Sequence, residues 1–146
     1  MNSTPENYST VCPFLMVEDI EKQMDFLTNV FNGTVKENLK TPDGITQHGE
    51  VRVGDTVIMM GRGSKDFPSQ PSMNYMYVSN VDETYKKALL NGATKVMEPA
   101  DRFYGVRECG VKDFHGNTWW IAQHIKNVSV EEMEKGMAEA KKNTQK

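Results

Sequence analysis

A unit of strand, helix and further strands that occurs twice in the chain constrains its fold more than any other feature. In each copy an Asp or Asn opens a helical pattern directly after an apolar strand, at Asp19 and at Asn80. Each copy also ends in a strand hairpin whose turn contains a Gly, around Asp55 and around Gly116. Both pairs of landmarks are 61 residues apart (80 minus 19 and 116 minus 55). Two landmarks with one spacing indicate an internal duplication.

The first copy, residues 10–61, is predicted to have the order β-α-β-β-β. Residues 10–17 form an apolar strand, and the helix that follows has Asp19 as its N-cap. The helix ends near Gly33, which is expected to take the left-handed conformation after the last turn. Its apolar face has helical spacing, with Ile20, Met24, Leu27 and Phe31. The remaining strands are expected over residues 34–39, 45–53 and 56–60.

The second copy, residues 73–125, repeats this order after a linker at residues 62–72 that is rich in Gly, Pro and Ser. Residues 1–9 form a polar leader. Residues 126–146 form a C-terminal helix and tail, because Ser129 begins a capping-box pattern. The sequence therefore predicts one structural domain of the α+β class.

Composition excludes several classes of protein. With 38% hydrophobic and 25% charged residues and no apolar run near the roughly 20 residues of a membrane helix, the chain is expected to be soluble, with no membrane partner. The polar N-terminus has no secretory pattern, which predicts a cytoplasmic protein. A net charge of -3 without a Lys/Arg cluster excludes nucleic acid as the expected partner. Cys12 and Cys109 are expected to be free thiols, the second packed as a small hydrophobe.

The stretch at residues 103–121 carries a family resemblance. Phe-Tyr-Gly-Val-Arg at 103–107 is followed by Gly-Val-Lys-Asp-Phe-His-Gly-Asn-Thr-Trp-Trp-Ile at 110–121. With the duplication, this pattern resembles the vicinal oxygen chelate superfamily of glyoxalase I, bleomycin-resistance proteins, fosfomycin-resistance proteins and extradiol dioxygenases. It is most similar to the glyoxalase-like branch associated with phosphonate operons. The resemblance implies two tandem βαβββ modules forming a curved mixed sheet around a cleft, and a homodimer.

The resemblance also implies four positions at which relatives hold a divalent metal, and here they are Cys12, Met59, Met73 and Trp120. Metal-binding relatives have His, Gln or Glu at these positions, since such cations prefer oxygen and imidazole ligands. Because none of the four residues is of that kind, we predict no metal and no cofactor. Copper(I) held by the three sulfur residues is a less favoured alternative to apolar lining.

Strand alternation gives a candidate ligand-binding surface. It turns Cys12, Phe14 and Met16 toward the cleft, where Tyr75, Tyr77 and Trp120 join them, with His124 at the end of the last strand. An aromatic and thioether lining suits a flat or apolar small molecule, and plain core packing is the alternative. The predicted ligand-binding set is completed by Met59, Met73, Arg52, Tyr104 and Arg107, with Arg107 as an anion clamp or a structural ion pair.

His48, Glu50 and Arg52 share one face of the third strand. They are a candidate catalytic acid/base pair, His48 and Glu50, beside a cationic anchor, or else a solvated face. An alternative offset of 58 (108 minus 50) would make Glu108 the counterpart of Glu50 and bring two carboxylates together. His115, inside the last turn, is expected to be exposed.

The predicted function is binding of a small, partly aromatic or anionic molecule in an apolar cleft without the usual divalent metal, by a homodimer. One alternative is an enzyme of the same superfamily, either a lyase or isomerase that uses His48 and Glu50 or a metal-dependent enzyme such as a dioxygenase. Another is a structural or regulatory dimer whose cleft is filled by its own side chains.

Overall fold

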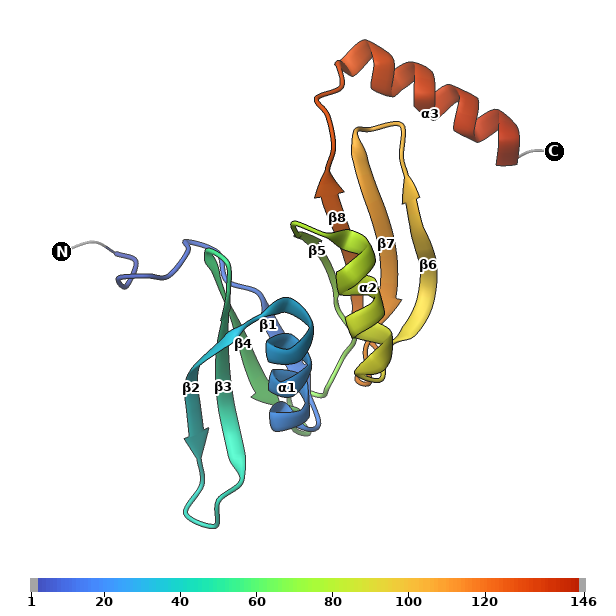
Figure 1. The fold of residues 1–146 in the computed structure, drawn as a ribbon. Coiled ribbons are helices and arrows are strands. Elements are labelled where there is room, and N and C mark those ends of the chain that lie inside the picture. Colours follow the sequence, from blue (N-terminus) through green and yellow to red (C-terminus); the bar gives the residue numbers. More distant parts are fainter. Residues whose placement is uncertain (1–2, 145–146) are drawn as a thin grey trace.

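The computed structural model describes residues 3–144 and shows two βαβββ modules followed by a helix (Figure 1). The first module contains β1 (Phe14–Val17), α1 (Ile20–Phe31), β2 (Thr34–Lys40), β3 (Thr46–Val53) and β4 (Thr56–Arg62). The second contains β5 (Met73–Tyr77), α2 (Val81–Leu90), β6 (Thr94–Asp101), β7 (Val106–Lys112) and β8 (Thr118–His124), and α3 (Val130–Thr144) ends the chain. The predicted α+β class with tandem modules is confirmed.

Each module has its own four-stranded mixed sheet, in the order β1-β4-β3-β2 and β5-β8-β7-β6. The first strand of each sheet runs parallel to the last, and the other neighbours are antiparallel. The edge strands are β1 and β2 in one sheet and β5 and β6 in the other. No helix within residues 3–144 has both the length and the apolar composition that crossing a membrane requires.

The strand register shows which residues of the two modules correspond. Met59 pairs with Phe14 and Glu50, and Trp120 pairs in the same way with Tyr75 and Gly110. Glu50 therefore corresponds to Gly110, an offset of 60 (110 minus 50). The offset of 58 that would match Glu50 with Glu108 is wrong. Glu108 instead occupies the place of His48, because Glu108 pairs with Ala122 and His48 with Gly61.

Helices α1 and α2 begin directly after Asp19 and Asn80, as predicted. The Asp19 carboxylate accepts a hydrogen bond from the Lys22 backbone N–H at 3.0 Å, and Asn80 caps α2 in the same way. The end of α1 differs from the prediction, since Asn32 and not Gly33 takes the left-handed conformation, with φ of 56°. Gly33 is instead required by close packing, because a Cβ there would lie 2.5 Å from the Val51 side chain.

Buried side chains of both modules form one continuous hydrophobic core within residues 3–144. Trp119 of the second sheet packs against the Phe26 and Phe31 rings of α1, with 5.3 Å between the Phe31 and Trp119 centroids. Fully burying one such large side chain contributes about 2 kcal/mol. Both sheets turn one face to this common core, so their other faces point outward. We call the outward face of the first sheet the first open face and that of the second sheet the second open face.

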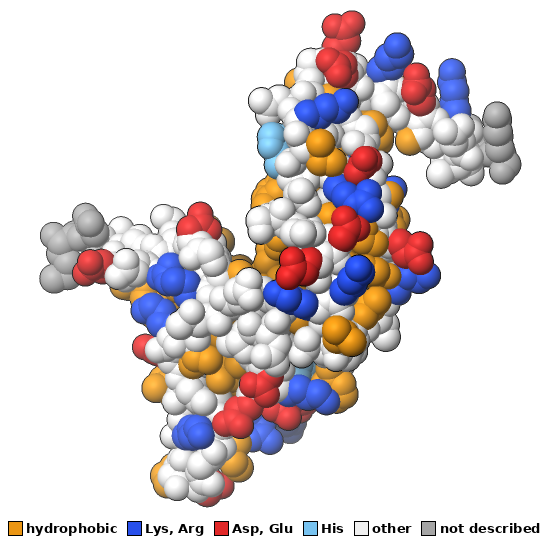
Figure 2. All heavy atoms as spheres, viewed as in Figure 1, with side chains coloured by type: hydrophobic (Ala, Val, Ile, Leu, Met, Phe, Trp, Pro, Cys, Tyr) orange, Lys and Arg blue, Asp and Glu red, His pale blue; other side chains and the backbone are white. Residues whose placement is uncertain are grey.

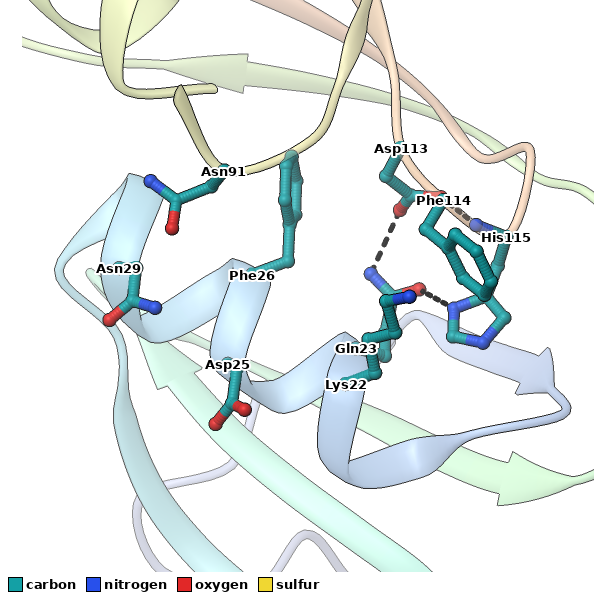
Figure 3. A pocket seen from close by; sticks show the side chains of 9 residues that line it. All are labelled: Lys22, Gln23, Asp25, Phe26, Asn29, Asn91, Asp113, Phe114 and His115. Carbon is teal, nitrogen blue, oxygen red and sulfur yellow. Dashed lines mark hydrogen bonds between the residues drawn. The ribbon is translucent and has the colours of Figure 1, made fainter. Parts of the chain in front are cut away.

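A buried polar network joins the modules near the start of α1 (Figure 3). The Asp113 carboxylate accepts hydrogen bonds from Gln23 Nε2 at 2.8 Å and from Trp119 Nε1 at 2.9 Å. His115 Nδ1 lies 2.9 Å from Gln23 Oε1, and the Asp19 backbone N–H donates to His115 Nε2 at 3.2 Å. His115 is therefore a half-buried bridge and not an exposed turn residue. Burial lowers its pKa, consistent with a neutral ring whose proton is on Nδ1.

Candidate functional site

The second open face exposes large apolar side chains to solvent. Met73, Tyr75 and Tyr77 alternate along β5 and are 72%, 49% and 68% exposed. Met76 and Val78 take the opposite side and pack against the core, so the predicted alternation is correct. Figure 2 shows the molecule hollowed between the modules, where a groove of about 630 Å³ lies between β5 and residues 53–56 of the first module. The edge strand β5 thus forms one wall of this groove.

Glu108 of β7 is at the centre of the second open face and is only 6% exposed. The Tyr75 hydroxyl donates to one of its carboxylate oxygens, and the Tyr104 hydroxyl donates to the other at 2.5 Å. Burial and the hydrogen bond to Glu108 raise the pKa of Tyr104 to about 12, and the same causes raise the pKa of Tyr75. Both phenols therefore keep their protons at neutral pH and remain hydrogen-bond donors to the carboxylate.

An open hollow of about 510 Å³ lies beside Glu108. Its walls are mostly aromatic, formed by Tyr75, Met97, Arg102, Phe103, Tyr104, Glu108 and Trp120. Trp120 lies over the backbone of Gly110, where no side chain displaces it. Phe103 packs against α3 at Gly136, since a Cβ on Gly136 would lie 2.6 Å from the Phe103 ring. The aromatic walls are thus supported by packing, although the hollow itself is open.

The first open face is lined by Phe14, Met16 and Met59, with Phe14 51% exposed. The Phe14 ring lies 6.0 Å from the His48 ring. Cys12, just before β1, is partly exposed, and its thiol donates to the Ser9 carbonyl oxygen at 3.4 Å. Three of the sequence-predicted ligand-binding residues are thus neighbours on this face, and Cys12 lies beside them.

His48 and Glu50 form a hydrogen-bonded pair on the same face, with 2.8 Å between His48 Nε2 and Glu50 Oε2. The Tyr8 hydroxyl donates to the other carboxylate oxygen at 2.6 Å. Glu50 is 4% exposed, and burial opposes its ionisation. The hydrogen bonds from Tyr8 and His48 outweigh burial and lower the pKa of Glu50 below its ordinary value. Arg52 donates to the Asn7 carbonyl oxygen. The leader therefore contacts this face through hydrogen bonds at both Asn7 and Tyr8.

The four positions at which the family resemblance implies a metal do not suit a divalent cation in this chain. Cys12, Met59, Met73 and Trp120 offer one thiol, two thioethers and an indole, whereas Mg²⁺, Mn²⁺ and Fe²⁺ prefer oxygen and imidazole ligands. Within residues 3–144, one group does combine those types, since ligand atoms of Glu37, His48 and Glu50 lie within 4.8 Å of one another. It lies beside Met59 on the first open face.

Arg107 is the one predicted ligand-binding residue that the structure places elsewhere. It faces α2, where its guanidinium forms a two-bond ion pair with Asp82 at 2.9 and 3.0 Å and also bonds Asp101. The alternation of β7 explains this placement, because Glu108, one residue later, takes the open face. Of its two predicted roles, anion clamp and structural ion pair, Arg107 therefore has the second.

Several residues of the open faces were missing from the sequence prediction. The leader residue Tyr8 gave no signal, since a polar leader has no periodicity. Met97, Arg102 and Phe103 reach the hollow through the irregular pairing of β6 and the loop after it. The sequence did indicate Glu108, because strand alternation places it on the opposite face from Cys109, which was predicted to be packed in the core.

The comparisons with known proteins agree with this architecture. The model of the Glyoxalase/Bleomycin resistance protein/Dioxygenase superfamily matches residues 10–121. The chain therefore belongs to this superfamily, as the resemblance predicted. An uncharacterized protein of Mycobacterium bovis is 28% identical over 137 residues, covering 86% of this chain and 90% of that protein.

Solved structures show the same fold. TioX from Micromonospora sp. ML1 superposes with a TM-score of 0.70 at 23% identity, covering 80% of this chain and 99% of that one. TnmS3, an antibiotic binding protein from Streptomyces sp. CB03234, superposes with a TM-score of 0.61 at 17% identity, covering 80% and 97%. At these identities the likeness concerns the fold alone.

Proposed function

We propose that the protein binds a small, flat, partly aromatic molecule on its open faces without a divalent metal. The observation that carries this proposal is the second open face, where Trp120 and half-exposed Tyr75 surround the buried carboxylate of Glu108. Contiguous exposed apolar side chains with a few placed polar groups are typical of ligand sites. The description of TnmS3 as an antibiotic binding protein adds a reason to include antibiotics in a ligand screen.

The working state is a homodimer in this proposal. Each open face supplies one wall, and a ligand cleft needs two. Because the two faces of one chain both point away from its common core, one chain does not close them on each other. A two-fold dimer would oppose the first open face of one chain to the second open face of its partner, giving two equivalent clefts. Val130 and Met137, exposed on α3, add apolar surface for such an assembly.

Two measurements test this function. Protein purified without chelator is analysed for metals and screened with planar aromatic compounds by tryptophan fluorescence. We expect saturable quenching that is lost in Trp120→Phe and kept in Trp119→Phe, no stoichiometric metal, and twice the chain mass by light scattering. About one equivalent of Ni, Mn, Fe or Zn per chain would contradict the metal-free proposal. No saturable quenching by any compound would favour a structural or regulatory dimer with filled faces.

The His48–Glu50 pair favours a second candidate, a lyase or isomerase. The 2.8 Å contact gives His48 a carboxylate that orients its ring. The position on the first open face would bring this pair to a molecule bound in the cleft. If a compound is transformed, His48→Ala and Glu50→Ala should each lower turnover by about 10²-fold or more. Full turnover in both variants would remove them as acid and base.

A further inference from the structure

We propose that the ligand carries a positively charged nitrogen and that this nitrogen pairs with Glu108. This inference rests on the proposed function and names the chemical class of its ligand. The structural basis is a buried carboxylate that has hydrogen bonds but no counter-charge, at the wall of a hollow lined by aromatic rings.

Glu108 differs from the other buried carboxylates of the molecule. Within residues 3–144, no Lys, Arg or His nitrogen lies within 4.0 Å of its carboxylate, whereas Glu50 has His48 at 2.8 Å. Asp113 also has no ion pair, but it is enclosed by the donors of Gln23, Asn117 and Trp119. Glu108 borders an open hollow of about 510 Å³. A buried charge without a partner is costly, so a cation entering the hollow would relieve that cost.

The walls of the hollow favour a cation over a neutral ligand. Trp120, Phe103 and the two tyrosines present aromatic surfaces around Glu108. A cation over an aromatic face gains about 0.5–2 kcal/mol. The two phenol hydroxyls bind the carboxylate from opposite oxygens and keep it in place. A flat aromatic ring with a charged nitrogen at its edge would stack on Trp120 and direct that nitrogen to Glu108.

Two arginines that the sequence offered as ligand anchors are already engaged by other groups. Arg52 donates to the Asn7 carbonyl oxygen, and Arg107 is paired with Asp82. Arg102 lines the hollow, but its guanidinium contacts Met97 Sδ and is more than 4.0 Å from the Glu108 carboxylate. Arg102 would therefore weaken cation binding by repulsion without neutralising Glu108. The sequence predicted a partly aromatic or anionic ligand; the inference keeps the aromatic character and replaces the anion by a cation.

Three probes with one ring system test the charge preference: 9-aminoacridine as the cation, acridone as the neutral compound and acridine-9-carboxylate as the anion. Their affinities are measured by fluorescence titration on the full chain. We expect 9-aminoacridine to bind at least tenfold more tightly than the other two. Glu108→Gln should remove this preference while leaving acridone affinity within about twofold. Arg102→Gln should strengthen 9-aminoacridine binding severalfold. Glu83→Gln, at an exposed position of α2, is the matched charge control and should leave the affinities of all three probes unchanged.

Each other outcome has a defined meaning. If acridone or the carboxylate binds as tightly as 9-aminoacridine, the cation inference is overturned while the proposed function stands. If Glu108→Gln keeps the full preference, the assignment to Glu108 is overturned. If Glu108→Gln fails to fold, the Arg102→Gln result decides alone, and weaker or unchanged cation binding in that variant contradicts the inference. If none of the three probes binds saturably, both the inference and the proposed function lose support.

Discussion

The Trp120 indole lies so close to Gly110 that a Cβ on Gly110 would be 2.6 Å from Trp120 Cζ3. The two residues are paired on neighbouring strands β7 and β8. The absence of a side chain at Gly110 is what lets the indole lie along the sheet beside Glu108. The position of the most important aromatic wall of the hollow therefore depends on a glycine that contacts no ligand itself.

Gly110→Ala should displace Trp120 from the second open face. The new methyl group meets a rigid ring, and overpacking of this kind costs about 1–3 kcal/mol. We expect a shifted tryptophan emission maximum and about tenfold weaker binding of the planar probes. Gly49→Ala is the control, because it meets Met24 and Ile20 on the core side of the first sheet. It should lower stability without moving the Trp120 emission. Unchanged probe affinity in Gly110→Ala would show that Trp120 is not a wall of the site.

Asp113→Ala should be strongly destabilising, because it removes the acceptor shared by Gln23 and Trp119 at the junction of the modules. Leaving buried donors without an acceptor costs about 1–3 kcal/mol for each group, so a loss of about 3 kcal/mol is expected in urea unfolding. Asp66→Ala, at an exposed loop position, should change stability by less than about 0.5 kcal/mol. A loss below about 1 kcal/mol for Asp113→Ala would mean that the network does not hold the modules together.

Glu50 should make stability depend on pH in the acid range. Its pKa in the folded protein is below the ordinary value of 4.5, so its stabilising effect is complete above that value. The effect is lost as the pH falls below 4.5 through the lowered folded pKa. Tyr8→Phe removes one of the hydrogen bonds that lower the pKa and should reduce this dependence. Urea unfolding at pH 6 and at points below 4.5 measures it, with Tyr77→Phe as the control. Parallel pH profiles for wild type and Tyr8→Phe would contradict the assignment.

The two thiols should differ sharply in reactivity. Burial raises the pKa of Cys109 to about 12, and its side chain is in the core, so the reactive thiolate is absent under native conditions. Cys12 is partly exposed. A thiol-disulfide reagent should modify one thiol per chain in native protein and a second only after unfolding. Cys12→Ser should abolish the native reaction. A native reaction that persists in Cys12→Ser would mean that the core opens around Cys109.

Much of the open faces was predictable because strands have a period of two residues. The alternation of Tyr75 and Tyr77 with Met76 and Val78 assigned both sides of β5 from the sequence alone. The same rule placed His48 and Glu50 together. For Arg107 the sequence left an anion clamp and a structural ion pair open, and only the contact with Asp82 of α2, 25 positions away, decides for the ion pair.

The relation between the modules was not predictable from either copy alone. The duplication defines two similar sheets, but it does not say which faces pack together. Contacts between distant segments decide this, chiefly Trp119 with Phe31 and Asp113 with Gln23. For the same reason the leader residue Tyr8 could not be assigned to Glu50, 42 positions away.

The most direct test of metal-free binding on the open faces is a nuclear magnetic resonance titration of the two indole N–H signals in metal-depleted protein. Trp119 and Trp120 are adjacent but lie on opposite faces, and the Trp119 N–H is held by Asp113 at 2.9 Å. With 9-aminoacridine or acridone added, the Trp120 signal should shift saturably while the Trp119 signal stays within its line width. Assignment comes from Trp119→Phe and Trp120→Phe. Signals that both remain unmoved, or a shift of Trp119 alone, would contradict the proposed site.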